Sequence, residues 1–160
     1  MAEACYRSQC LISARPLPQA VLTRQMSFRF INPESLGAAR GYSNGVLTDA
    51  GGRLLFIAGQ IGWDERQQIV SADFVDQFDR ALANVIAVVT EAGGSAEMIA
   101  RLLIYVTDIN EYRSHTREIG DRYRARMGKH FPAMALVEVK GLLEDAAKVE
   151  IEGIAVMSDR

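Results

Sequence analysis

Hydrophobic and polar residues alternate along two stretches near the C-terminus, Ala133 to Lys140 and Lys148 to Met157. Successive side chains of a β-strand leave opposite faces of the sheet, so alternate residues share a face. In the second stretch, one face carries only small or apolar residues, namely Val149, Ile151, Gly153 and Ala155. The opposite face mixes acidic and aliphatic residues, namely Glu150, Glu152, Ile154 and Val156. The pattern predicts two strands joined by a short loop that begins at Gly141.

Three further strands and two helices are predicted upstream. The strands are residues 43–47, 53–61 and 99–108, and the turn-forming residues 49–52 (DAGG) predict a hairpin between the first two. The first helix begins near Ser71 or Asp73 and ends at Gly93-Gly94. Its core-facing stripe recurs at helical spacing and consists of Phe74, Phe78, Leu82, Val85 and Val89. The second helix is expected over residues 111–127, with Asp108 or Asn110 as its cap.

This order of elements predicts an α+β fold with a single mixed β-sheet and two helices packed on one face. We assign the aliphatic face of the sheet to the helices. The other face would then expose a large apolar area, contributed by Leu54, Phe56, Leu103, Tyr105, Met134, Leu136, Ile154 and Val156. Monomeric proteins rarely expose such a patch. We therefore expect a homo-oligomer built on this sheet face, although symmetry alone leaves the number of subunits open.

The composition excludes several classes of function. The chain has 160 residues and a net charge of −2, which favours a single domain without a polybasic face for nucleic acid. Arginines of the second predicted helix alternate with Glu111, Glu118 and Asp121, which indicates a salt-bridged surface. No apolar run approaches the ~20 residues that span a bilayer. We expect neither nucleic acid nor a membrane as a partner.

Residues 1–25 differ from the rest of the chain, with two prolines, three arginines, one acidic residue and no clear periodicity. Three interpretations stay open: an extension upstream of a natural start at Met26, a targeting segment for an organelle, or an ordered arm that packs on a neighbour. Both cysteines, Cys5 and Cys10, lie in this extension, so the predicted domain, residues 26–160, has no disulfide scaffold. The cytoplasm is the expected location.

Four segments together resemble one protein family. They are residues 41–46 (GYSNGV), 56–61 (FIAGQI), 105–108 (YVTD) and the C-terminal region 131–156, which holds a Pro-small-x segment, a Val-Glu-Val and a Val-Glu-Ile-Glu strand. Over residues 27–157 the chain is similar to the RidA/YjgF family, some members of which are labelled endoribonuclease L-PSP. The resemblance implies a chorismate mutase-like fold and a homotrimer that binds a small molecule in clefts between adjacent subunits. The best-studied members are deaminases of reactive enamines and imines.

By this resemblance, Glu150 matches the family's strand glutamate, which is associated with activating water for attack on an imine. A carboxyl group desolvated at an interface can have its pKa raised toward a value useful in acid–base catalysis. The alternative for Glu150, and the favoured interpretation for Glu138, is a structural pair with Arg101, Lys140 or a neighbouring subunit.

The resemblance also assigns other cleft positions. Tyr42 matches the family's aromatic residue at the cleft, and Gly59 matches a backbone group that lines it. Thr116 falls where deaminating members often have an asparagine, and Ala58 falls where they often have a serine, so both are departures. Trp63 is a possible further wall of the cleft.

The main departure is Met134, because deaminating members carry there an arginine that grips the carboxylate of the enamine or imine acid. A guanidinium forms a bidentate, charge-assisted pair with a carboxylate, in which each hydrogen bond contributes roughly 1.5 to 3 kcal/mol. Methionine offers a flexible apolar surface and no donor. Arg101 and Lys140 are the candidates to replace the arginine, and we expect neither to reproduce its geometry. The predicted cleft therefore suits a neutral or less anionic ligand.

Three functions stay open at this point. The first is a hydrolase of an imine or enamine-type metabolite with altered substrate specificity, and the second is a non-catalytic metabolite-binding trimer. The third is an endoribonuclease or translation inhibitor, which the acidic balance and the absence of a histidine pair disfavour. His115 and His130 stand alone, without carboxylate or cysteine ligands at usable spacing, so we expect no metal and no other cofactor.

Overall fold

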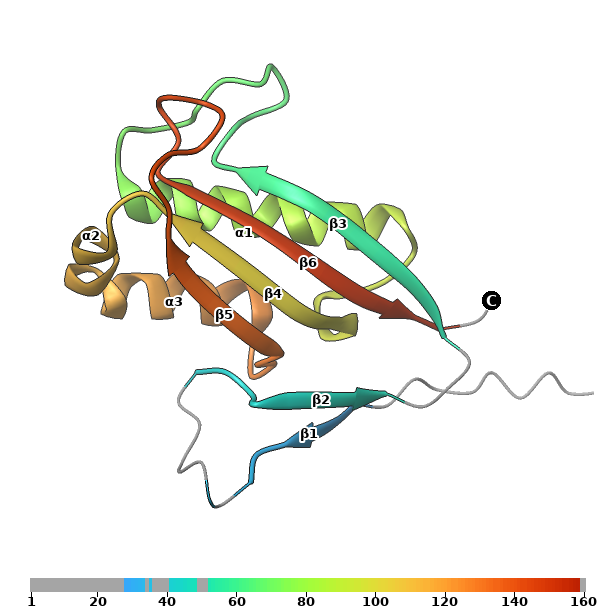
Figure 1. The fold of residues 1–160 in the computed structure, drawn as a ribbon. Helices are drawn as coiled ribbons and strands as arrows, with labels where there is room; N and C mark the ends of the chain where they lie inside the picture. Colours follow the sequence, from blue (N-terminus) through green and yellow to red (C-terminus); the bar gives the residue numbers. More distant parts are fainter. Residues whose placement is uncertain (1–27, 34, 36–40, 49–51, 159–160) are drawn as a thin grey trace, which may run out of the picture.

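The computed structural model describes residues 28–33, 35, 41–48 and 52–158 (Figure 1). The main sheet has four strands, β3 (Arg53–Ile61), β4 (Ile99–Val106), β5 (Ala133–Glu138) and β6 (Val149–Met157). They lie in the order β3-β6-β4-β5, with β4 and β5 parallel and the other neighbours antiparallel, so the sheet is mixed. A one-turn 3₁₀ helix, η2 (Ala96–Met98), precedes β4. The extension predicted at residues 1–25 lies outside the described residues.

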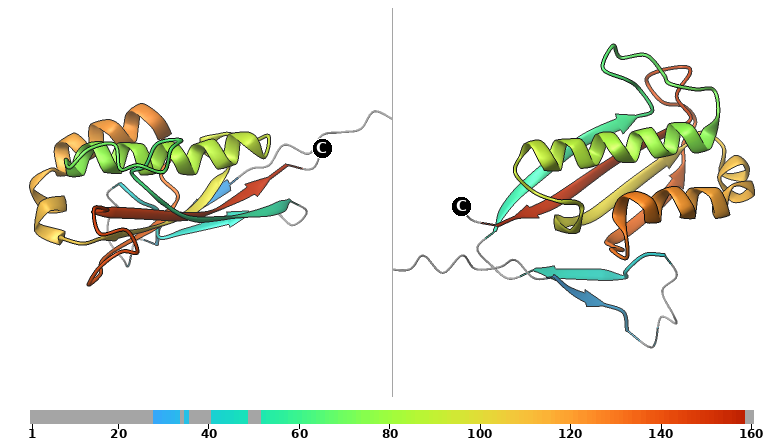
Figure 2. Two further views of the ribbon diagram at one scale, coloured as in Figure 1. Left: turned by 90° about the horizontal axis from the view of Figure 1, so that it is seen from above. Right: turned by 180° about the vertical axis from the view of Figure 1, so that it is seen from behind.

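Two long helices, α1 (Phe74–Glu91) and α3 (Thr116–Met127), cover one face of this sheet, as Figure 2 shows from above and from behind. The apolar stripe predicted for α1 is buried throughout. Asp73 is the N-cap of α1, because its side chain accepts a hydrogen bond from the N–H of Asp76 at 3.0 Å. The hydroxyl of Ser71, two residues before this cap, accepts a hydrogen bond from the N–H of Asp73. The predicted α+β class, with helices on one face of a mixed sheet, is confirmed.

The predicted hairpin between residues 43–47 and β3 is wrong. Strand β2 (Gly45–Thr48) pairs instead with β1 (Phe28–Ile31), a strand that the sequence analysis missed, and the two form a separate ribbon (Figure 1). The rings of Phe28 and His130 stack with their centroids 6.1 Å apart, which holds the ribbon beside the end of α3. Most of the predicted turn, residues 49–51, lies outside the described residues.

The second predicted helix is in fact two helices, α2 (Ile109–Ser114) and α3, which are separated at His115. His115 has φ −113° and ψ 19°, and its Nδ1 lies 2.8 Å from the carbonyl oxygen of Glu111. The hydroxyl of Ser114 donates to the same carbonyl, so side chains occupy the acceptor that a continuing helix would use. Asp108 caps α2 as predicted, accepting from two backbone N–H groups of its first turn.

Three arginines of α3 lie against carboxylates. Only Arg124 does so with a carboxylate that the sequence analysis named, Asp121, and the other two pairs reach across to α1. Arg126 donates two hydrogen bonds to Asp79, at 2.5 and 2.6 Å. Arg122 lies 3.9 Å from Asp76. These contacts join the two helices and occupy cations that a phosphate-binding surface would need.

The face of the sheet opposite the helices is open. Phe56 and Leu54 of β3 are 72% and 58% exposed on it, and Leu103 and Ile154 continue the apolar surface across the neighbouring strands. Exposed apolar area of this kind is typical of an interface, so a homo-oligomer built on this face stays our prediction.

The prediction that Met134 and Leu136 lie on the open face is wrong. The β4–β5 register pairs Leu102 with Met134 and Ile104 with Leu136, and residues paired across neighbouring strands share a face. Leu102 and Ile104 are buried in the core under the helices, and both residues of β5 pack against that core. Alternation along one strand separates two sets of residues, but only the register with a neighbour decides which set the helices cover.

Candidate functional site

Glu150 and Gly59, two of the predicted site residues, lie against each other. Strands β3 and β6 change register between Ile57 and Gln60, so that Ala58 and Gly59 form a β-bulge. A Cβ atom built on Gly59 would overlap the carboxyl group of Glu150, with its carboxyl carbon only 2.6 Å away. Glycine therefore leaves the space in which the carboxylate rests on the backbone of the bulge.

The sequence analysis placed two groups on the face of Glu150 but gave them no role at the site. Tyr105 lies directly across from Glu150 in the β4–β6 register, and Glu152 shares the same face two residues further along. Burial raises the pKa of the Tyr105 phenol, and a hydrogen bond with Glu152 together with the charges of Glu152 and Glu150 raises it further. The phenol is therefore neutral near pH 7 and can donate a hydrogen bond beside two carboxylates. The register that pairs Tyr105 with Glu150 was needed to find it.

A hollow of about 370 Å³ continues along the open face from these residues. Its walls include Phe56, Ala58, Arg101, Leu103, Glu152 and Ile154. Ala58, a predicted cleft residue, therefore faces this hollow. Arg101 lies here as well, on the face that carries Glu152, and so it is placed away from Met134.

Met134 lies on the helix-covered side, at the β5 edge of the sheet. Two adjoining cavities of about 210 and 260 Å³ share four residues as walls, namely Gly41, Ile104, Tyr112 and Met134. We call these two cavities the Met134 groove. Tyr42 lines one of them and Thr116 lines the other. The structure thus brings three predicted site residues together, but it separates them from Glu150 and Gly59.

Tyr42 reaches the groove because the next residue is tied to the start of β5. The hydroxyl of Ser43 donates to the carbonyl of Phe131 at 2.7 Å, and its N–H donates to the carbonyl of Pro132 at 3.1 Å. Gly41 has a φ of 74°, a left-handed conformation that glycine adopts without steric cost. These contacts fix the segment against β5.

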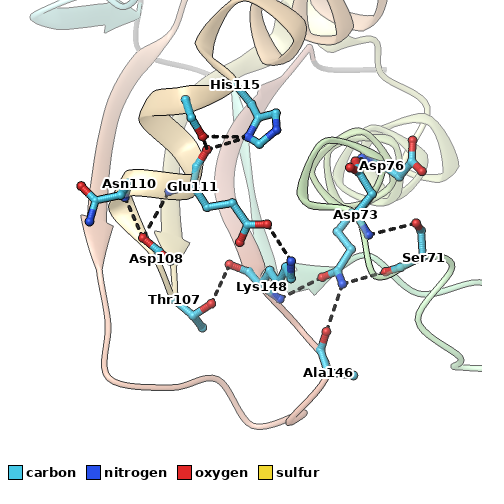
Figure 3. Close-up of polar contacts among 12 residues, drawn as sticks. Ser71, Asp73, Asp76, Thr107, Asp108, Asn110, Glu111, His115, Ala146 and Lys148 are labelled. Carbon is cyan, nitrogen blue, oxygen red and sulfur yellow. Dashed lines mark hydrogen bonds and ion pairs between the residues drawn. The ribbon is translucent and has the colours of Figure 1, made fainter.

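Thr116, the first residue of α3, is positioned through the α2 turn before it. The carboxylate of Glu138 accepts a hydrogen bond from the N–H of Ile109 at 3.0 Å, which gives Glu138 a structural contact with the helix backbone instead of a cation. Lys148 donates to Glu111 at 2.6 Å, as Figure 3 shows, and ties α2 to the start of β6. The wall of the groove that α2 forms is therefore tied to β5 through Glu138 and to the start of β6 through Lys148.

The start of the strand that carries Glu150 is fixed by Gln77, a fully buried side chain of α1. Its amide group donates to the carbonyls of Ser71 and Ala146, at 2.8 and 3.0 Å. Its oxygen accepts a hydrogen bond from the N–H of Lys148 at 2.8 Å, so that three segments converge on one side chain.

The two candidates for replacing the missing arginine lie elsewhere. Arg101 faces the open-face hollow, and Lys140 lines a separate hollow of about 800 Å³ formed by the loops before α1 and after β5. The Met134 groove contains Arg124 instead, a residue to which the sequence analysis gave no role at the site. Gly120 lines the groove one helical turn earlier, and a glycine inside a helix four residues before an arginine was the available signal.

Trp63 follows β3 and forms an isolated bridge with Ile69. Its carbonyl accepts hydrogen bonds from Arg80 at 2.9 Å and Asn84 at 3.0 Å. Trp63 lines neither the Met134 groove nor the open-face hollow, so its role as a cleft wall stays a prediction.

Both histidines make structural contacts. His115 marks the break between α2 and α3, and His130 is buried with its Nε2 2.7 Å from the carbonyl oxygen of Ile99. Among the described residues, no group of three or more His, Cys, Asp or Glu side chains could hold a metal ion. Within the same residues, no helix combines the length and apolar character needed to cross a membrane.

The fold and the bulge define a small α+β protein in which a glutamate of the central strand rests on a glycine of its neighbour. The chain belongs to the RidA/YjgF family, because the family model described as Endoribonuclease L-PSP matches residues 33–157. The resemblance seen in the sequence is thereby confirmed.

Known relatives agree with this assignment. A 2-iminobutanoate/2-iminopropanoate deaminase of Salmonella typhimurium is 34% identical over 108 residues, which cover 66% of this chain and 80% of the relative. A Rid family protein of unknown function from Yersinia pestis has a structure with a TM-score of 0.73 and 28% identity, covering 81% of this chain and 98% of that one. The structure of Escherichia coli TdcF with bound serine has a TM-score of 0.58 and 34% identity, covering 76% and 92%.

Proposed function

We propose that this protein hydrolyses an imine or enamine-type metabolite and that Glu150 activates the attacking water. The observation that carries the proposal is the seat of the Glu150 carboxylate on the bulge at Gly59, beside the neutral phenol of Tyr105. The Salmonella relative that acts on 2-imino acids supports this class of substrate.

The reaction needs one group that can take up a proton and return it. The Glu150 carboxylate accepts a proton from water as the water oxygen attacks the imine carbon, which gives a tetrahedral carbinolamine. The carboxylic acid returns this proton to nitrogen, which completes the neutral carbinolamine. The carboxylate then takes the proton of the carbinolamine hydroxyl and passes it to nitrogen as the C–N bond breaks, so the products are a ketone and ammonia. An enamine substrate first takes up a proton at carbon and becomes the imine. The overall balance is one imine and one water consumed for one ketone and one ammonia.

A second copy of the chain is required for both groups of residues to meet one ligand. Glu150 and Gly59 belong to the region of the open face, whereas Tyr42, Thr116 and Met134 line a groove on the helix side. Exposed Phe56 and Leu54 offer the apolar surface for association. We therefore propose a homotrimer with ligand clefts between adjacent subunits, in which one subunit contributes the glutamate and its neighbour contributes the groove.

The test is ammonia release from freshly generated 2-aminoacrylate and 2-iminopropanoate, measured for the wild type and for Glu150→Gln. Removing the base is expected to lower the rate by at least about a hundredfold, the scale of general-base catalysis. Glu91→Gln, an exposed glutamate at the end of α1, is the matched control and should retain full activity. Turnover that Glu150→Gln leaves unchanged would remove Glu150 from the mechanism.

One observation favours a second function, binding without catalysis. Met134 lines the groove where deaminating relatives are expected to hold an arginine, so the scaffold is kept while an anchor for small anionic substrates is absent. In that case a bound imine or ketone would be recovered intact after prolonged incubation with the trimer, and ammonia release would stay at the uncatalysed rate.

A further inference from the structure

Arg124 is a cation that lines the Met134 groove. It comes from α3 and shares one of the two cavities with Met134, Thr116 and Tyr112. Arg101 and Lys140 line other hollows, so within one subunit neither is placed to serve a ligand that rests on Met134.

Gly120 gives the Arg124 guanidinium its position. A Cβ atom at Gly120 would lie 3.3 Å from one terminal guanidinium nitrogen of Arg124 and 3.8 Å from its central carbon. The side chain of Arg124 therefore folds back over the helix surface at a residue with no side chain of its own. Glycine weakens a helix interior, so its presence one turn before Arg124 is explained by the space that it leaves.

The guanidinium is partly but not fully engaged. It donates to Asp121 at 2.5 Å, and the two side chains are 59% and 64% exposed, so water and salt screen this pair. A guanidinium has five N–H donors, and a single carboxylate oxygen leaves most of them available to a second anion. Apart from Thr116, the side chains that line the rest of the groove are apolar or aromatic, and they include Met134, Ile104 and Tyr112.

We propose that Arg124 binds the carboxylate of the ligand in place of the missing arginine at position 134. The ligand class that fits is a carboxylate with an apolar body, such as a branched-chain 2-imino acid or its 2-oxo product, with the body on Met134 and Tyr112. This inference rests on the proposed function, since it names the substrate class of the same cleft. The sequence alone favoured a neutral or less anionic ligand, whereas Arg124 favours an anionic ligand that is longer than a three-carbon acid.

The test is isothermal titration calorimetry of the full-length protein with 4-methyl-2-oxopentanoate, with its neutral methyl ester and with pyruvate. The wild type should bind the branched acid about tenfold more tightly than the ester, the scale of one charge-assisted contact at a partly exposed site. Pyruvate should bind more weakly than the branched acid, because it leaves the apolar part of the groove empty.

Arg124→Gln should remove the preference for acid over ester while leaving the affinity for the ester unchanged, and Arg124→Lys should restore part of it. Arg122→Gln is the matched control, since Arg122 lies on the same helix but points to Asp76. An acid preference that persists in Arg124→Gln, or a wild type that shows no preference or binds neither compound, overturns the proposal.

A failure of this inference can be told apart from a failure of the proposed function. Glu150→Gln should keep the acid-over-ester preference and lose ammonia release. Ammonia release by a wild type without the preference would leave Glu150 as the base and remove Arg124 as the anchor. The preference without ammonia release would keep Arg124 and identify a binding protein.

Discussion

The bulge at Gly59 and the Met134 groove lie on different sides of one sheet and differ in what fixes them. At the bulge, the backbone of β3 and the carboxyl group of Glu150 are in direct contact, and any side chain at position 59 would overlap that carboxyl group. In the groove, the walls are side chains from α2, α3, β5 and the segment before β2. The first arrangement tolerates little change, whereas the second can exchange residues while the fold persists. The chemistry of a family can thus stay constant while the choice of ligand moves.

The largest effect is expected where the bulge is filled. Gly59→Ala would place a methyl group on the Glu150 carboxyl, and a displacement on the order of 1 Å of a catalytic group can cost about a hundredfold in rate. We expect ammonia release to fall by this amount with only a modest loss in thermal stability. Gly141→Ala is the control, because a Cβ there meets no atom within 4 Å. Full activity in Gly59→Ala would show that the contact with Glu150 is dispensable.

A smaller effect is expected when the groove is changed toward its relatives. Met134→Arg restores a bidentate anchor for small acids, and a charge-assisted hydrogen bond of roughly 1.5 kcal/mol corresponds to about tenfold in affinity. Binding of pyruvate, measured by calorimetry, should therefore tighten about tenfold, while 4-methyl-2-oxopentanoate should lose affinity. Leu143→Arg, which adds the same charge at a residue 94% exposed, controls for a general effect of charge. Equal tightening in both variants would contradict the expected role of position 134.

The smallest effect concerns the tyrosines of the two regions. Burial raises the pKa of Tyr123, which backs the groove and donates to the carbonyl of His130 at 2.9 Å. An unfolded tyrosine loses its proton near pH 10 while the folded one keeps it, so this stabilisation is present below pH 10 and is lost as the pH rises toward the folded pKa. The free energy of unfolding should fall by up to about 1.4 kcal/mol for each pH unit above 10.

Urea unfolding at pH 9, 10 and 11 measures this slope, and Tyr123→Phe should flatten it. Tyr105→Phe on the less enclosed open face should flatten it less. Equal flattening by both substitutions would mean that burial in the groove is not the cause.

Much of the fold followed from the sequence because local patterns carried it. The stripe of α1, the cap at Asp108 and the outward position of Glu150 depend only on residues near one another in the chain. The family resemblance then assigned both Glu150 and Gly59 to the ligand cleft, although they lie 91 residues apart in sequence. Their direct contact became visible only in the structure.

The remaining errors came from contacts between distant segments. Met134 was placed on the wrong face because its face depends on pairing with Leu102 of β4. The ribbon of β1 and β2 packs through the stacking of Phe28 on His130, a contact between distant residues that no local sequence pattern predicts. Arg124 was interpreted as one of several salt-bridged arginines, and only the cavity beside Gly120 distinguishes it from Arg122 and Arg126.

The position of β6 has a consequence for how the protein is made. β6 lies between β3 and β4 in space but follows every other described element along the chain. Until residues 149–157 have been synthesised, β3 therefore has no partner in the main sheet, and β4 is paired with β5 on one edge only. During translation, the apolar stripes of α1 and α3 are therefore covered by an incomplete sheet. Exposed apolar surface and unpaired strand edges favour aggregation at this stage. The strand that carries Glu150, the proposed base, is also the strand that completes the sheet, so a nascent chain acquires this residue and its stable core in the same step.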